Sequence, residues 1–171
     1  VITGSSDDRR FLLDWGSFHV KHDYMDLYKD YNKSLKHRNS LLKKNELINL
    51  DYWTELVSNL GTKINTIRAA YFNDLNNMFE NIKDEMQNLL PSIYADINES
   101  TISYNQGWPK DLTLEESLKN TLNKDMVLKH TTSGPHRADI YFSAGPGDLK
   151  NVSSMSTQII SSLLVIMSQA R

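Results

Sequence analysis

A Gly-Pro turn followed by two basic side chains is the strongest candidate for binding chemistry in this chain. Gly134 and Pro135 precede His136 and Arg137, and Asp139 follows. Proline restricts φ to about −65° and lacks an N–H, and glycine adopts backbone angles closed to other residues. The turn therefore predicts a rigid corner that holds both basic groups in one direction. An arginine held in this way suits a phosphate on DNA or on a nucleotide.

An ordinary tight turn with solvated charges is the alternative interpretation of this corner. In that case Arg137 pairs with Asp139 or Asp125, and His136 packs on a sheet. The run Ile140-Tyr141-Phe142, which has the residue types of a strand, would supply the sheet. Both interpretations stay open from the residues alone.

A basic segment between residues 29 and 44 is the second candidate for phosphate contact. Asp30 is its one acidic residue, against Lys29, Lys33, Lys36, His37, Arg38, Lys43 and Lys44. Residues 73–100 are mainly acidic. This charge split predicts that Lys33, Lys36 and Arg38 turn one helix face toward a DNA backbone. The alternative is a solvated surface with ion pairs across a helical hairpin, each contributing at most about 1 kcal/mol.

The clearest periodic signal lies in the middle of the chain and predicts one long helix. Apolar residues step by three and four at Leu56, Leu60, Ile64, Ile67, Tyr71, Leu75, Met78, Ile82, Met86 and Leu89. The helix would be about 50 Å long, with a seam like that of a coiled coil. We expect the helix over residues 23–44 to cover the seam as the other half of an antiparallel hairpin. Gly61 weakens the helix by about 1 kcal/mol relative to alanine.

Shorter elements complete an α+β, mostly helical chain. A capping box of Thr113 and Glu116 opens a helix that carries Leu114, Leu118, Leu122 and Met126. The sequence also predicts helices over residues 5–16 and 156–170 and strands over residues 101–105 and 140–143. The expected organisation is a head segment at 1–20, a helical arm at 21–92 and a further head segment at 93–171.

Composition excludes several classes of function. The chain has 171 residues and a net charge of −2, so any contact with DNA must come from a local patch. It has no cysteine, which excludes disulfides, thiol nucleophiles and cysteine-based zinc sites. His19 and His22 lack a third metal ligand. No apolar run approaches the roughly 20 residues of a membrane span, and we expect no metal site and no membrane.

Three runs in the chain resemble motifs of the RecF family of DNA repair proteins. The run TTSGPHRAD at residues 131–139 is similar to the family signature TTxGPHRxD. The run ITGSSDDRRFLLDWG at residues 2–16 is similar to the family segment (I/L)xGSxxxRRxFLD, and QGW at residues 106–108 resembles a third motif. The matches are dense near both ends of the predicted arm and sparse within it.

The resemblance implies part of an ABC-type ATPase head with an inserted helical-hairpin arm. ATP and Mg would be held between two heads of a homodimer that clamps DNA, duplex or at single-/double-strand junctions. It implies a bacterial cytoplasmic, nucleoid-associated protein of recombination, repair, replication and the SOS response. Its partners would be RecO- and RecR-like proteins, acting at single-strand gaps. Arg9 and Arg10 would support the head, with Gly134, Pro135 and Asp139 as structural motif residues.

The nucleotide motifs of this family are incomplete here. None of the seven glycines belongs to a phosphate loop, and the family places that loop and the Walker B aspartate outside this stretch. Ser156 and Gln158 stand for a signature that binds nucleotide in trans, but its glycine is absent. We expect no ATP hydrolysis and no cofactor for the chain by itself. The hypotheses are an interrupted RecF gene, a shortened chain, a coiled-coil interaction module without nucleotide chemistry, and an ATPase assembled from separate pieces.

Overall fold

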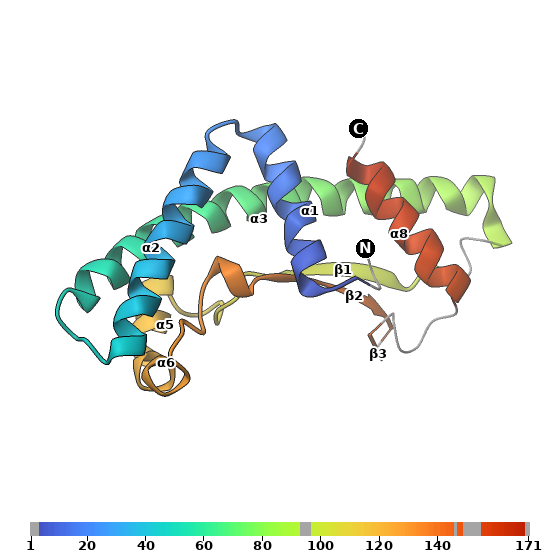
Figure 1. Cartoon of the computed structure of the whole chain (residues 1–171). Coiled ribbons are helices and arrows are strands. Elements are labelled where there is room, and N and C mark those ends of the chain that lie inside the picture. The colour runs from blue at the N-terminus through green and yellow to red at the C-terminus, as the bar shows by residue number, and fades with distance from the viewer. Residues whose placement is uncertain (1–3, 93–96, 146, 149–154, 170–171) are drawn as a thin grey trace. The chain divides into compact units, whose positions relative to one another are not determined.

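The computed structural model describes residues 4–92, 97–145, 147–148 and 155–169, which are mostly helical with one small sheet (Figure 1). This confirms the predicted fold class. In chain order the elements are α1 (Ser6–Val20), α2 (Tyr24–Lys44), α3 (Leu50–Leu89), β1 (Ser100–Asn105), α5 (Leu114–Asn120), α6 (Leu122–Leu128), the 3-10 helix η1 (Pro135–Arg137), β2 (Asp139–Ala144), β3 (Gly147–Asp148) and α8 (Met155–Gln169).

The chain divides into two compact units. The sheet unit contains residues 1–16, 70–104 and 139–171, and the hairpin unit contains residues 17–69 and 105–138. Helices α1 and α3 each contribute residues to both. The expected division at residues 1–20, 21–92 and 93–171 stays a prediction.

The sheet unit packs helices on a three-stranded sheet of order β1-β2-β3. Strands β2 and β3 are antiparallel, with Ser143 opposite Asp148. Burial alternates along β2, since Ile140 and Phe142 are buried and Tyr141 is exposed, as expected of a strand with one covered face. The apolar core joins α1, the second half of α3, Ile97 ahead of β1, strands β1 and β2, and α8. Its buried residues are Leu12, Leu13, Tyr71, Phe72, Leu75, Phe79, Ile82, Ile97, Ile102, Ile140, Phe142 and Val165.

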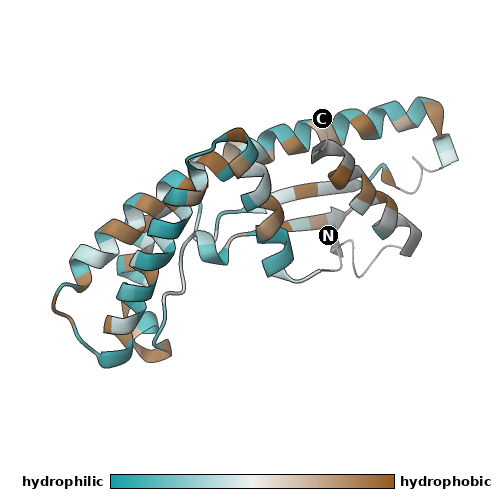
Figure 2. Ribbon diagram, turned by 45° about the horizontal axis from the view of Figure 1, so that its top comes forward, coloured by the Kyte–Doolittle hydropathy of each residue, from teal (hydrophilic) through white to brown (hydrophobic). Residues whose placement is uncertain are grey.

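The hairpin unit packs α2 antiparallel to the first part of α3. Side chains near the start of α2 meet residues far along α3, and those near its end meet the start of α3. The contacts pair Tyr24 with Arg68, Tyr31 with Gly61, and Arg38 with Thr54. Figure 2 shows hydrophobic and hydrophilic residues alternating along both helices, as expected of helices with one buried face. Beyond Tyr71, the seam of α3 packs in the core of the sheet unit instead.

Gly61 marks a close approach between α3 and α5. A Cβ at this position would lie 2.5 Å from Cδ2 of Leu114 and 3.2 Å from the ring of Tyr31. The first distance is shorter than real contacts of a Cβ atom, and Leu114 is buried, so a side chain at this position would force its neighbours to shift. The helix propensity lost at Gly61 is therefore offset by packing that alanine would prevent.

The helix predicted after Thr113 is interrupted in the structure. The capping box is present, because Glu116 N–H donates to Thr113 Oγ1 at 3.2 Å and Thr113 N–H donates to Glu116 Oε2 at 2.8 Å. The helix ends at Asn120, and α6 begins at Leu122. Thr121 forms the joint, where its hydroxyl donates to the carbonyl of Ser117 at 2.9 Å. The single helix predicted through Met126 is therefore wrong in its continuity.

Candidate functional site

The Gly-Pro corner is built on backbone geometry that requires glycine. Gly134 has φ of 135°, a region that side chains disfavour. Its N–H donates to the carbonyl of Gly107 at 3.1 Å, which brings the QGW run against the turn. Arg137 N–H then donates to Gly134 O at 2.8 Å and closes η1. The corner is thus a defined turn and not a flexible loop.

The two threonines of the signature fix its first half to α2 and α6. Thr131 Oγ1 accepts from Arg38 Nη1 at 2.6 Å and donates to Asn39 Oδ1 at 2.7 Å. Thr132 donates to Asp125 Oδ1 through its backbone N–H at 2.9 Å and its hydroxyl at 2.7 Å. Both threonines therefore act in positioning the chain.

His136 holds the turn against α2. Its Nε2 lies 3.0 Å from the carbonyl of Thr131, and its Nδ1 lies 2.7 Å from the hydroxyl of Tyr31. A carbonyl only accepts, so Nε2 carries the proton and Nδ1 accepts from Tyr31. Burial raises the pKa of Tyr31, which keeps that hydroxyl a donor. The structure engages both ring nitrogens of His136, so neither is left for the predicted phosphate contact, and its packing partner is α2, not a sheet.

Arg38 is fully buried, so its predicted contact with DNA is wrong. Its Nη1 donates to Asp125 Oδ2 at 2.9 Å, with both side chains at 0% exposure. Its Nε donates to Thr54 Oγ1 at 3.1 Å. A buried ion pair of this kind stabilises only while it stays complete, because removal of one partner leaves a charge without compensation. Arg38 therefore belongs to the internal network that holds Thr131.

Arg68 is a second buried arginine, and it lies outside every motif of the sequence. Its Nη1 donates to the carbonyl of Pro135 at 2.7 Å, and its Nε donates to the hydroxyl of Tyr24 at 3.0 Å. It lies seven residues after Gly61, on the same face of α3. That spacing was the available signal, since a charge on the buried face of a helix requires a partner.

Asp139 ends the signature in the sheet unit, where it binds Arg9. Arg9 Nε donates to Asp139 Oδ1 at 2.6 Å, and Nη2 donates to Oδ2 at 2.8 Å. Nη1 of Arg9 donates to the carbonyl of Gly4 at 2.8 Å. Arg10 pairs instead with Asp7 at 2.6 Å. These contacts place Arg9 in structural support of the sheet unit.

Arg137 remains as the outward-facing member of the signature. It is exposed, and across the described part of the chain no hydrogen bond or ion pair engages its side chain. The alternative pairing with Asp139 or Asp125 is wrong, because Arg9 and Arg38 occupy those carboxylates.

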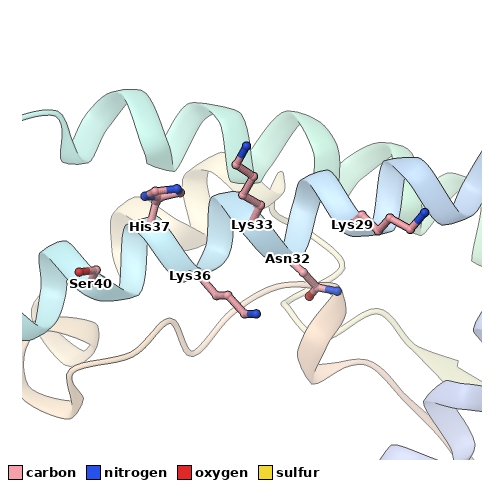
Figure 3. A pocket seen from close by; sticks show the side chains of 6 residues that line it. All are labelled: Lys29, Asn32, Lys33, Lys36, His37 and Ser40. Atoms are coloured by element: carbon pink, nitrogen blue, oxygen red, sulfur yellow. The ribbon is translucent and has the colours of Figure 1, made fainter.

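A basic face of α2 forms the second candidate site (Figure 3). A shallow hollow of about 560 Å³ is lined by side chains at helical spacing, Lys29, Asn32, Lys33, Lys36, His37 and Ser40. Lys33 and Lys36 are exposed, and no ion pair to either occurs among the described residues. The ring of His37 stacks on Trp53 at 4.4 Å between centroids. The sequence predicted Lys33 and Lys36 for this face, and the structure places them together on it.

An acidic hollow lies elsewhere in the hairpin unit, at the start of α3 and on α5. Its volume is about 530 Å³, and it is lined by Asp51, Tyr52, Thr54, Glu55, Glu115 and Lys119. A hydrogen bond to Glu115, at 2.5 Å, raises the pKa of Lys119. The single cation of this hollow is thus already paired, and the hollow repels phosphate.

The predicted nucleotide signature lies at the start of α8. The side chain of Ser156 falls outside the described residues, and Gln158 is half-buried. Within the described residues, no group of three or more His, Cys, Asp or Glu side chains is placed to hold a metal ion. None of the helices in the described part has the length and apolar character of a bilayer span.

Known proteins resemble this chain in sequence and in fold, although no protein-family model matches it. The DNA replication and repair protein RecF of Pseudoalteromonas translucida (strain TAC 125) is 34% identical over 157 residues, covering 90% of this chain and 41% of the relative. RecF of Stutzerimonas stutzeri (strain A1501) is 33% identical over 160 residues, covering 92% and 41%. The chain belongs to the RecF family. The resemblance read from the three runs is thereby confirmed.

Solved RecF structures have the same fold. One, described as the recombination mediator protein RecF with ATP in the RecFOR pathway, has a TM-score of 0.81 at 24% identity, covering 98% of this chain and 46% of the other. A second, with ATPrS, has a TM-score of 0.81 at 26% identity and covers 98% and 47%. The chain spans about two fifths of the length of the RecF relatives named above.

Proposed function

We propose that this RecF-family chain supplies a DNA-binding surface to an ATP-dependent protein of recombinational repair, replication and the SOS response. The basic face of α2 is the observation that carries this proposal. Across the residues that the structure describes, neither Lys33 nor Lys36 forms an ion pair, on a protein whose net charge is −2. Such a local patch is the electrostatic pattern expected of a backbone contact on DNA.

The spacing of the lysines on α2 suits the repeat of a DNA backbone. Seven residues separate Lys29 from Lys36, which is about 10.5 Å along a helix. Lys29 also pairs with Asp26 at 3.0 Å, but both side chains are exposed, so a phosphate can replace this weak pair. Phosphates of one strand advance about 3.4 Å along the duplex axis, so this face matches roughly three of them. Contacts of this type position a protein on DNA without reading the bases. The proposed binding is therefore independent of sequence.

The acidic hollow restricts how DNA approaches the hairpin unit. Asp51, Glu55 and Glu115 repel phosphate, whereas the lysines of α2 attract it. The opposed signs favour one orientation of the bound duplex. They also account for a basic surface on a protein that is acidic overall.

The nucleotide, the partners and the location of the whole protein extend this proposal. ATP with Mg would join two heads, with Ser156 and Gln158 at the nucleotide of the partner head. RecR- and RecO-like proteins would bind the assembly at single-strand gaps in the bacterial cytoplasm, at the nucleoid. The descriptions of the solved relatives, with ATP and in the RecFOR pathway, support this extension. By itself the chain is proposed to lack ATPase activity, since none of its glycines belongs to a phosphate loop.

The test measures binding of a fluorescent 20-bp duplex to the chain over a range of salt concentrations. With about three phosphates neutralised, log K should fall with log salt at a slope of about −2.7. Removing Lys33 and Lys36 together should reduce the slope to about −0.9. Replacing Lys110 and Lys124 by alanine is the matched control, because both are exposed lysines of the same unit. Equal slopes in both double variants would refute the α2 surface.

A protein-interaction module is a second candidate, favoured by the connection between α2 and α3. Leu47 is 64% exposed and Ile48 is 72% exposed at this tip. Adjacent exposed apolar side chains are frequent where another protein binds. Under this alternative, replacing Leu47 and Ile48 by serine abolishes capture of a RecR-like partner, while DNA binding is unchanged. The two candidates are therefore separated by which pair of substitutions removes which ligand.

A further inference from the structure

Nearly every residue of the signature is committed to holding the turn. Within the hairpin unit, Thr131, Thr132 and His136 bind through their side chains. Ser133 Oγ accepts from Ser117 at 3.0 Å, and the carbonyl of Pro135 accepts from Arg68. The hydrogen bonds come from α2, α3, α5 and α6. One short segment is thus fixed from four helices.

The side chain left outside this network belongs to Arg137. An arginine that is only solvated gains nothing from a fixed backbone, whereas an arginine that binds a ligand does gain from it. A fixed backbone lowers the conformational entropy lost on binding. The guanidinium stays charged at all ordinary pH values and offers paired donors to a phosphoryl group. The two acidic groups that flank it in the sequence, Asp125 and Asp139, are neutralised by other arginines.

The basic face of α2 indicates which class of anion this arginine meets. Tyr31 binds His136, the neighbour of Arg137, and the next residue of α2, Asn32, lines the basic hollow. In Figure 3, Asn32 points toward the ribbon of the turn. The turn and the hollow are therefore attached to the same stretch of α2. A polyanion is the ligand that uses both.

We propose that Arg137 is an anchoring site for a phosphoryl group, and that the rest of the turn exists to hold it. The phosphoryl group belongs either to a nucleic-acid backbone or to a nucleotide. Tyr31 acts as a positioning residue, through its hydrogen bond to His136. The proposal is separable from the α2 surface, because replacing Arg137 leaves all of the lysines of α2 in place.

The test compares Arg137→Gln and Arg137→Lys with Lys124→Gln, a control at an exposed position of the same unit. The probes are a 20-bp duplex and ATP, each titrated against the full 171-residue chain. Arg137→Gln should weaken binding of one probe about tenfold or more, because a charge-assisted bidentate contact is lost. Arg137→Lys should recover part of it, since the charge returns without the paired donors. The thermal midpoint should not change, because the side chain is exposed.

The two probes separate the two sources of phosphate. Loss for the duplex alone assigns Arg137 to nucleic acid, and loss for ATP assigns it to a nucleotide. If Arg137→Gln binds both probes as Lys124→Gln does, the proposal is overturned. It is equally overturned if the unaltered chain binds neither probe. If replacing Lys33 and Lys36 leaves duplex binding unchanged while Arg137→Gln weakens binding, only the proposed DNA surface on α2 is refuted.

A double-mutant cycle tests the positioning role of Tyr31. Tyr31→Phe keeps the ring and removes the hydroxyl that donates to His136. It should weaken binding of the same probe severalfold. Combined with Arg137→Gln, it should add no further loss, because the group that it positions is gone. Additive losses would mean that Tyr31 affects binding independently of Arg137, and its positioning role would be overturned.

Discussion

Arg9 and Asp139 form a two-point ion pair between residues that lie 130 positions apart, with N–O distances of 2.6 and 2.8 Å. The contact joins α1 to the first residue of β2 in the sheet unit. It also joins the RecF-like run at residues 2–16 to the last residue of the run at residues 131–139. The pair thus gives a physical reason for Arg9 in the one run and for Asp139 in the other.

We expect loss of this pair to destabilise the sheet unit. The side chains are only 16% and 13% exposed, so a single replacement leaves the partner poorly solvated. Arg9→Ala or Asp139→Asn should lower the free energy of unfolding by about 2–3 kcal/mol in urea titrations. Arg10→Ala is the control, because Asp7, the carboxylate that pairs with Arg10, is 89% exposed and stays solvated after the replacement. If Arg10→Ala lowers the free energy of unfolding as much as Arg9→Ala does, the structural role of the Arg9–Asp139 pair is contradicted.

Gly61→Ala provides a test in which helix propensity and packing predict opposite signs. Propensity alone predicts a gain of about 1 kcal/mol. The new methyl group would lie 2.5 Å from Leu114, so overpacking should instead cost about 1–3 kcal/mol. Thr62→Ala, at the next and exposed position, should be neutral or slightly stabilising. Thermal melts followed by circular dichroism measure both variants, and a higher midpoint for Gly61→Ala would disprove the close approach.

Replacing Arg38 should abolish DNA binding through loss of the fold and not through loss of a contact. Arg38→Ala leaves Asp125 buried without a partner, at a cost of about 3–5 kcal/mol. Lys33→Ala, at an exposed position, should leave stability within about 0.5 kcal/mol. Urea unfolding measures both. If the Arg38→Ala chain stays folded but does not bind DNA, the contact with DNA that the sequence predicted for Arg38 would be supported.

The capping box at α5 should make stability depend on acid pH. Hydrogen bonds from Thr113 lower the pKa of Glu116 from its ordinary value of 4.5. A group with a lowered folded pKa stabilises above its unfolded value, and this stabilisation is lost as the pH falls through the folded value. The thermal midpoint of Glu116→Gln should therefore lie below that of the unaltered chain at pH 7. The difference should shrink as the pH falls below about 4.5. A difference that is constant down to pH 3 would contradict the charged cap.

Local chemistry made several elements predictable from sequence. The steps of three and four from Leu56 gave the long helix, although α3 begins earlier, at Leu50. Thr113 and Glu116 gave the start of α5, because a capping box depends on four consecutive residues. The break at Thr121 was not predictable from apolar spacing, since Leu118 and Leu122 keep the helical period across it.

The type of a charged residue indicated its place in a candidate site only where its side chain is exposed. The sequence assigned Lys33 and Lys36 to the basic face. Arg38 was wrongly grouped with them, because the run of charges was considered without the position of each residue around the helix. Arg38 follows Tyr31 by seven residues and Leu35 by three, which places it on the buried stripe of α2. Its partner, Asp125, lies 87 positions away, and no local pattern points to it.

Helix α2 carries two sets of side chains with different roles on one backbone. Lys33 and Lys36 face solvent, whereas Tyr31 and Asn39 grip the turn that presents Arg137. A ligand that shifts this helix would also strain the hydrogen bonds from Tyr31 and Asn39 that hold the turn. By thermodynamic linkage, a ligand bound at the lysines then changes the affinity at Arg137, and a ligand bound at Arg137 changes the affinity at the lysines by the same factor. Through this one helix, binding at the lysines and binding at Arg137 would thus be coupled within the hairpin unit.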